Sequence, residues 1–150
     1  MNQWVFSLVT DKLTLTMQIA KRVSQLAQNQ SDEALMIGAY STLTATLYFL
    51  GDFKAARQNT TLGLKIWNSG GIQSAVEEIY APPVSCLIVK AGSEWHFGEI
   101  TSCEADLIEL STRQTFAFWL PAGEIFRGWA RSICGSPAEG TAWIEDGIRA

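Results

Sequence analysis

The sequence is poor in the residues that most metal sites and disulfide frameworks need. Its 150 residues contain one histidine, three cysteines and four prolines. A protein zinc site takes several histidine or cysteine ligands, so a single histidine predicts no metal site. Three cysteines, an odd number at wide spacing, favour reduced thiols in a cytoplasmic protein over a set of disulfides.

A basic stripe and a long apolar run are missing as well. Eleven Lys and Arg are scattered among fifteen Asp and Glu, and the net charge is −4. Nucleic-acid binding depends on neutralising phosphates, so this balance argues against it. No apolar run reaches the roughly 20 residues that cross a bilayer, and the N-terminal stretch lacks the features of a signal peptide. We therefore expect a cytoplasmic protein that binds neither nucleic acid nor membrane.

Apolar residues recur at helical spacing on both sides of Gly51-Asp52. Each set steps by three or four residues, which is the pattern of one apolar helix face. The sets are Met36, Tyr40, Leu43, Leu47 and Leu50 before the turn, and Phe53, Ala56, Thr60, Leu64 and Trp67 after it. Two helices joined by a tight turn cannot bury such faces alone, so this hairpin must pack on neighbouring helices.

Similar patterns predict further helices along the chain. They cover about 11–28, 84–97, 100–111, 116–133 and 137–149, and residues 4–8 look like the remnant of another helix. We also expect a short helical turn at 74–80. Ser31 or Asp32 can cap the helix that follows them, and Pro121 should kink its helix or delay its start. The predicted fold class is all-α, with about six or seven helices.

Three glycines mark the turns of a repeated unit. Gly51, Gly98 and Gly135 are 47 and 37 residues apart, which are spacings typical of helical repeats. Small residues lie at matching positions before and after these turns: Thr44, Ala91 and Gly128, then Ala56, Cys103 and Gly140. Small side chains at such positions let two helices cross closely. The predicted units are about 34–68, 83–112 and 116–150, with a partial unit at 1–30, in one domain over 1–150.

The repeated pattern resembles the tetratricopeptide repeat, with its small residues and its Gly-acidic-aromatic turn. The segments AYSTLTATLYFLGDFKAAR and PPVSCLIVKAGSEWHFGEI are similar to the C-terminal repeats of bacterial cyclase/ATPase-type multidomain signalling regulators. The resemblance implies an antiparallel helical-hairpin solenoid, shortened by about one repeat. It also implies a non-catalytic regulatory module for protein interaction, a fragment of a signal-transduction regulator.

No catalytic constellation accompanies the repeats. The sequence has no GxxxxGK[ST] phosphate loop. His96 with Cys86 or Cys103 would form a nucleophile–base pair, but no orienting group or oxyanion hole accompanies it. Glu94 and Glu99 near His96 do not complete a metal site. We expect no enzymatic activity, no cofactor and no metal, with His96 an ordinary residue at a helix end.

Aromatic residues are the leading candidates for a binding site. In tetratricopeptide solenoids the first helix of each pair lines a concave groove, and the resemblance assigns to it Ser41, Ala45, Tyr48, Phe49, Ile88, Trp95, His96, Ile125, Trp129 and Ile133. The candidate partner-binding residues among them are Tyr48, Phe49, Trp95, His96, Ile125 and Trp129. Tyr and Trp are frequent hot spots of peptide recognition. The alternative is that these rings simply fill the core.

The expected partner is a protein or peptide bound in this groove. Terminal repeats without polar caps leave apolar faces open, so self-association through the terminal helices is a second expectation. An alternative function is a small-molecule sensor, in which the loop 70–83 closes over an aromatic pocket near Trp95. The pair Glu77-Glu78 in that loop would suit a basic partner, or would simply be solvated.

Overall fold

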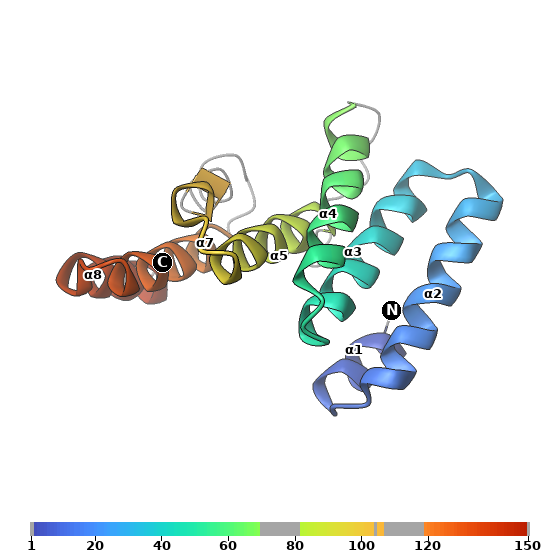
Figure 1. Cartoon of the computed structure of the whole chain (residues 1–150), viewed down its shortest axis with the longest axis horizontal. Coiled ribbons are helices and arrows are strands. Elements are labelled where there is room, and N and C mark those ends of the chain that lie inside the picture. The colour runs from blue at the N-terminus through green and yellow to red at the C-terminus, as the bar shows by residue number, and fades with distance from the viewer. Residues whose placement is uncertain (1, 70–81, 104, 107–118, 150) are drawn as a thin grey trace. The chain divides into compact units, whose positions relative to one another are not determined.

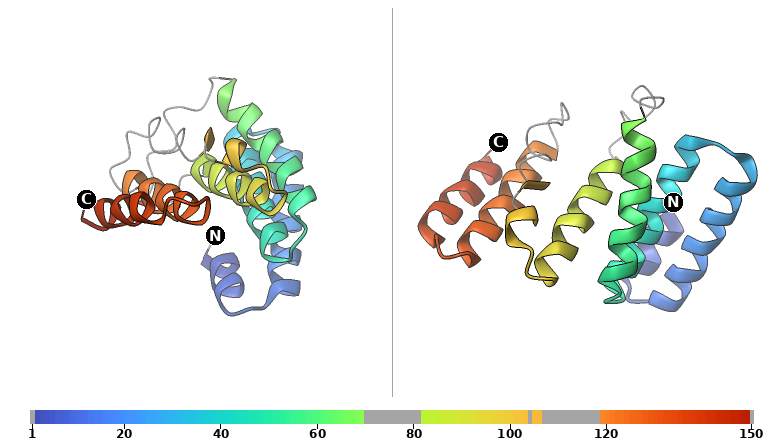
Figure 2. Two further views of the ribbon diagram at one scale, coloured as in Figure 1. Left: turned by 60° about the vertical axis from the view of Figure 1, so that its left-hand side comes forward. Right: turned by 45° about the horizontal axis from the view of Figure 1, so that its top comes forward.

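A computed structural model describes residues 2–69, 82–103, 105–106 and 119–149 (Figures 1 and 2). Within these residues every regular element is an α-helix and no strand is present, which confirms the all-α prediction. The helices are α1 (Asn2–Val9), α2 (Leu13–Gln30), α3 (Glu33–Phe49), α4 (Phe53–Asn68), α5 (Pro82–His96), α7 (Trp119–Ile133) and α8 (Pro137–Arg149). Residues 100–103 and 105–106 are also helical.

The described helices follow the sequence prediction closely. Residues 4–8 belong to the complete short helix α1, and Asp32 caps α3 by accepting hydrogen bonds from the backbone N–H groups of Ala34 and Leu35. Pro121 lies two residues after Trp119, the first described residue of α7, and the helix continues through it to Ile133. The predicted helix start at 116 lies outside the described residues. The helical turn expected at 74–80, the loop 70–81 and Glu77-Glu78 lie outside the described residues.

The chain divides into two compact units, Met1–Ser93 and Glu94–Ala150. In the first unit consecutive helices pack on one another, α1 on α2, α2 on α3 and α3 on α4 (Figure 2). The buried cluster at its centre consists of Trp4, Ala20, Ala45, Ala56 and Val89. Three of these five residues are alanines, whose small side chains let the helices approach closely around the one tryptophan. A single domain over 1–150 stays a prediction.

Buried hydroxyl groups also contribute to the interior of the first unit. The buried side chains of α3 include Ser41, Thr42, Thr44 and Thr46. Buried hydroxyls need partners, and here Trp4 Nε1 donates to Thr46 Oγ1 at 2.9 Å while Thr46 Oγ1 donates to the carbonyl of Thr42. The Trp4 indole therefore connects α1 to α3, two helices that lie far apart in sequence.

The turns between paired helices share one geometry. The three glycines predicted as corners all have positive φ, +81° at Gly51, +76° at Gly98 and +101° at Gly135. In each turn the next residue donates its N–H to a carbonyl five residues earlier: Asp52 to Leu47, Glu99 to Glu94 and Ser136 to Arg131. This 6→1 bond is the mark of a Schellman cap, which ends a helix through a left-handed residue.

A fourth turn of the same kind lies at Asp11. Asp11 has φ +58°, and Lys12 donates its N–H to the carbonyl of Ser7, again five residues earlier. The sequence repeat did not include this corner because it has no glycine. Five residues after each corner, the side chains of Thr16, Ala56 and Cys103 and the glycine Gly140 are buried. The same corner geometry, with a buried residue five positions later, therefore occurs four times within the described residues.

In the second unit, α7 and α8 cross at glycines. A Cβ added to Gly128 would lie 2.5 Å from the carbonyl oxygen of Gly140, and one added to Gly147 would lie 2.7 Å from the carbonyl oxygen of Pro121. Around this crossing, Arg131 Nε bonds Glu139 Oε2 at 2.9 Å, and the Arg127 guanidinium lies 4.0 Å from the ring centroid of Trp143. This close backbone contact sets which side of α7 faces α8, and so which side faces away from it.

Candidate functional site

The six candidate partner-binding residues fall into two groups, one in each unit. Tyr48 and Phe49 lie at the end of α3 in the first unit, with ring centroids 5.8 Å apart. Trp95 and His96 end α5, and Ile125 and Trp129 lie on α7. All six are within the described residues, and each group is described within its own unit.

Tyr48 is largely a packing residue. Its hydroxyl lies 2.8 Å from where a Cβ on Gly92 would be placed, so the ring fills the space that this glycine of α5 leaves open. Tyr48 also packs against the core cluster and meets Phe53 edge to face, with centroids 5.4 Å apart. Phe49, the next residue, is exposed. Of the two, only Phe49 offers most of its ring to a partner.

Two other groove positions in α3 are buried in the first unit. Ser41 and Ala45 are inaccessible to solvent or nearly so. Ala45 belongs to the central cluster with Trp4 and Val89. Neither side chain can touch a docked peptide in this conformation, so the α3 contribution to a binding surface reduces to its last turn.

Trp95 and Trp129 form a ring pair in the second unit. Their centroids are 5.0 Å apart and their planes are tilted by 54°. Aromatic pairs of this spacing add roughly 0.5–1.5 kcal/mol beyond burial of their area. Trp95 is half-buried, and it holds one side of the Trp129 ring while the rest of that ring stays exposed.

The exposed apolar surface of α7 is the strongest feature of this unit. Phe126, Trp129 and Ile133 are 41%, 43% and 52% exposed. They are spaced i, i+3 and i+7, so they lie on one side of the helix. We call these three residues the α7 face. Ile125 is not part of it, because its Cγ1 lies 2.9 Å from where a Cβ on Gly147 would be placed, toward α8.

Sequence reasoning selected Ile125, which is partly buried toward α8, and did not select Phe126, which is exposed. The groove position was carried over from a repeat pattern, which does not by itself show which side of α7 faces α8. The signal that would have found Phe126 is the Gly128–Gly140 crossing. Once Gly128 is set against α8, a residue two positions earlier on the helix points to a different side.

The described thiol and imidazole groups differ in how far they are exposed to solvent. Burial raises the pKa of the Cys86 thiol to about 12, which keeps it protonated and unreactive. Cys103 is buried, whereas Cys134 and His96 are exposed. Within the described residues no group of three or more His, Cys, Asp or Glu side chains is placed to hold a metal ion.

Comparisons with protein-family models, with curated proteins and with solved structures find no significant match. The tetratricopeptide resemblance therefore stands on the residues of this chain alone. Among the described helices, none combines the length and apolarity required to cross a membrane. The sensor alternative depends on the loop 70–83, most of which lies outside the described residues, and it stays a prediction.

Proposed function

We propose that this chain is a non-catalytic helical-repeat module of the tetratricopeptide-like kind, which binds a protein segment through the α7 face. The observation that carries this proposal is the exposed, fixed ring of Trp129 between Phe126 and Ile133. The parent would be a bacterial signalling regulator of the cyclase/ATPase type, and the module would work in the cytoplasm.

The α7 face has the composition of a recognition surface. Tryptophan is the most favoured hot-spot residue, and hot spots lie beside well-packed neighbours that exclude water. Trp129 meets both conditions, because Trp95 packs on one side of its ring. Contiguous exposed apolar patches on monomeric proteins often mark interaction sites.

Pre-organisation favours binding at this place. The ring pair restricts the rotation of Trp129, and the glycine crossing of α7 with α8 fixes the helix that carries it. A partner then loses less side-chain entropy in binding than it would on a mobile surface. The spacing of the three residues suits an apolar helix or an extended segment laid along α7.

The test compares what three forms of the immobilised chain retain from an extract of the source cell. The forms are wild type, Trp129→Ser and the control Leu62→Ser, whose leucine is 48% exposed on α4 in the other unit. We expect that some proteins are retained by both wild type and Leu62→Ser but are not retained by Trp129→Ser. For such a partner Trp129→Ser should weaken binding at least about thirtyfold, the usual scale for a hot-spot residue.

Two results would count against the proposal. One is a set of retained proteins that is the same for all three forms. The other is equal loss in Trp129→Ser and Leu62→Ser, which would mean that exposed apolar surface of any kind adheres to the extract. Far-ultraviolet circular dichroism of each variant verifies that the helices remain.

A further inference from the structure

A second exposed surface lies at the other end of the sequence, on the first helix pair. A groove of about 480 Å³ runs between α1 and α2. It is lined by Gln3, Phe6, Ser7, Lys12, Leu15 and Ile19. Phe6 is 61% exposed and Leu15 is also exposed, so the apolar lining is open to solvent. This volume lies within the range of ligand-binding clefts in proteins.

The groove carries positive charge. Among the described residues that line it, Lys12 is the one ionisable side chain, and its Nζ lies 5.4 Å from the ring centroid of Phe6. Over residues 2–30 the charged side chains are Asp11, Lys12, Lys21 and Arg22, a net charge of +2. The occupant of the groove should therefore combine an exposed apolar side chain with carboxylates.

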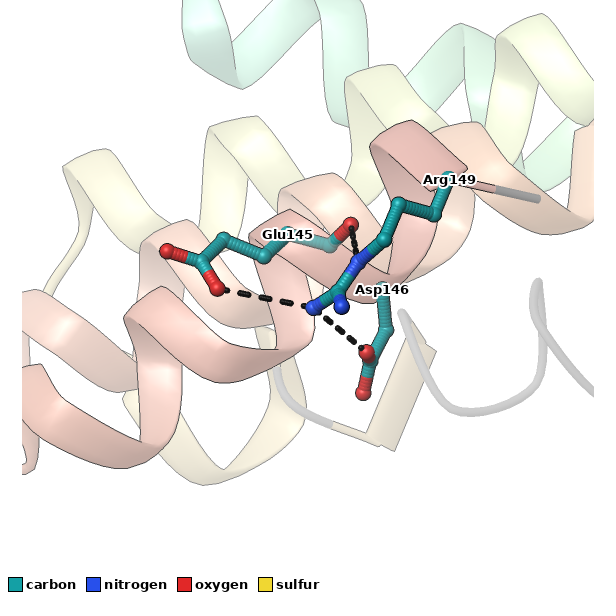
Figure 3. Close-up of polar contacts among 3 residues, drawn as sticks. All are labelled: Glu145, Asp146 and Arg149. Atoms are coloured by element: carbon teal, nitrogen blue, oxygen red, sulfur yellow. Dashed lines mark hydrogen bonds and ion pairs between the residues drawn. The ribbon is translucent and has the colours of Figure 1, made fainter.

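Helix α8 of this same chain has that combination. Ile148 is 71% exposed, and the carboxylates of Glu145 and Asp146 lie within one turn of it. Figure 3 shows that the Arg149 guanidinium bonds both: Nη2 lies 3.4 Å from Glu145 Oε2 and 3.2 Å from Asp146 Oδ1. Two carboxylates share one cation, so this patch keeps negative charge beside an apolar side chain.

We propose that the groove between α1 and α2 of one copy binds the Ile148 side of α8 in a second copy. Ile148 would enter the apolar lining beside Phe6 and Leu15, and Glu145 would face Lys12. Over residues 137–149 the charges of Glu139, Glu145, Asp146 and Arg149 sum to −2, which complements the +2 of the first helix pair. Charge complementarity of this kind selects a partner and sets register.

The two surfaces differ, so the contact is heterologous. Each copy offers one groove and one α8 patch, and copies join head to tail into a ring or a filament. A copy in which one surface is blocked ends the head-to-tail assembly, but it can still bind another copy through its second surface. This property separates the proposed contact from a symmetric dimer, and also from a groove and patch that meet within a single copy.

Sedimentation of two full-length variants tests the contact. Phe6→Asp blocks the groove and Ile148→Asp blocks the patch, and both positions are exposed, so the fold should be retained. We expect the mass of wild type to rise with concentration and each variant alone to stay monomeric. An equimolar mixture should give a dimer of one copy of each, at twice the monomer mass and no larger.

Leu62→Asp, on α4, is the control and should associate like wild type. The proposal is overturned if wild type stays monomeric over about a hundredfold range of concentration, where mass action would reveal association. It is also overturned if either groove or patch variant associates like wild type, or if the mixture remains monomeric.

A charge exchange tests the register of the contact. Lys12→Glu should weaken association about two- to fivefold, the scale of one exposed ion pair. The double variant Lys12→Glu/Glu145→Lys should associate as strongly as wild type, because the glutamate at 12 of one copy then meets the lysine at 145 of the next. Equal weakening in the single and the double variant would show that Lys12 and Glu145 do not meet.

Discussion

At the scale of single residues, the crossing of α7 and α8 depends on the absence of side chains. A Cβ on Gly140 would meet Ser132 Oγ and the carbonyl oxygen of Gly128, and backbone atoms cannot move aside cheaply. We expect Gly140→Ala to destabilise the fold by about 1–3 kcal/mol, the cost of overpacking. The measurement is the midpoint of urea unfolding followed by circular dichroism.

Gly38 provides the matched control within a helix. It lies inside α3, and an added Cβ there has no atom within 4 Å. Gly38→Ala should therefore stabilise the chain by about 0.5–1 kcal/mol, because alanine restricts the unfolded backbone and favours helix. Equal destabilisation by the two substitutions would contradict the glycine crossing.

The buried thiol of Cys86 makes stability depend on alkaline pH. Burial raises the pKa of Cys86 from 9.0 to about 12, so between these values the unfolded chain releases a proton that the folded chain keeps. The unfolded state then binds fewer protons, and this contribution to stability falls as pH rises, by at most about 1.4 kcal/mol per pH unit.

The Cys86 contribution can be isolated with two alanine variants. Urea unfolding at pH ~8 and pH ~10 should show a smaller loss of stability for Cys86→Ala than for wild type, since the raised pKa is absent. Cys134→Ala, which removes an exposed thiol, should lose as much stability between the two pH values as wild type does. A Cys86→Ala variant with the full wild-type loss would show that the thiol is not buried.

The sequence predicted which small residues are buried at the helix crossings. It did not predict which polar residues form hydrogen bonds with one another. Spacing from the turn glycines identified Ala56, Cys103 and Gly140, all of which are buried. The Trp4–Thr46 hydrogen bond joins residues 42 positions apart, and no local pattern carries that information. Likewise, which side of α7 faces α8 is set by the crossing at Gly128 and Gly140, and a local pattern does not contain that information.

At the scale of elements, one cap geometry ends four helices. The left-handed conformation costs an L-residue roughly 1–2 kcal/mol, a penalty that glycine escapes. We expect Gly51→Ala to destabilise by about 1 kcal/mol or more, although an added Cβ meets nothing there. Urea unfolding should show a lower midpoint with an unchanged slope, which marks a change of stability rather than of compactness.

At Asp11 the cost of the left-handed conformation predicts the opposite effect of substitution. It holds φ +58° as a non-glycine residue, so Asp11→Gly relieves strain at that corner. The gain is offset in part by the larger entropy of glycine in the unfolded chain, and we expect a net stabilisation of a few tenths of a kcal/mol to about 1 kcal/mol. A destabilised Asp11→Gly would mean that this turn differs from the other three.

Element positions were the most predictable property of the chain. Apolar spacing and turn glycines placed α3, α4, α5 and α8 to within a few residues, because each signal is local. The corner at Asp11 escaped notice because aspartate is not a strong marker of positive φ, even though it tolerates that conformation.

At the scale of the whole molecule, the chain forms two compact units that each expose an apolar surface. The first unit offers the groove at α1 and α2, and the second offers the α7 face. Both surfaces have the exposed apolar side chains that suit association. The sequence pointed to binding rather than chemistry, but which rings stay exposed depends on packing between helices that a periodic pattern cannot resolve.

The recurring corner is the claim on which both surfaces depend, and assigned backbone NMR of the full chain tests it most directly. Chemical shifts should give positive φ at Asp11, Gly51, Gly98 and Gly135. The amide protons of Lys12, Asp52, Glu99 and Ser136 should exchange slowly with solvent, because each is held by a carbonyl five residues earlier. Helical φ at any of these corners, or fast exchange of the four amides, would contradict the account.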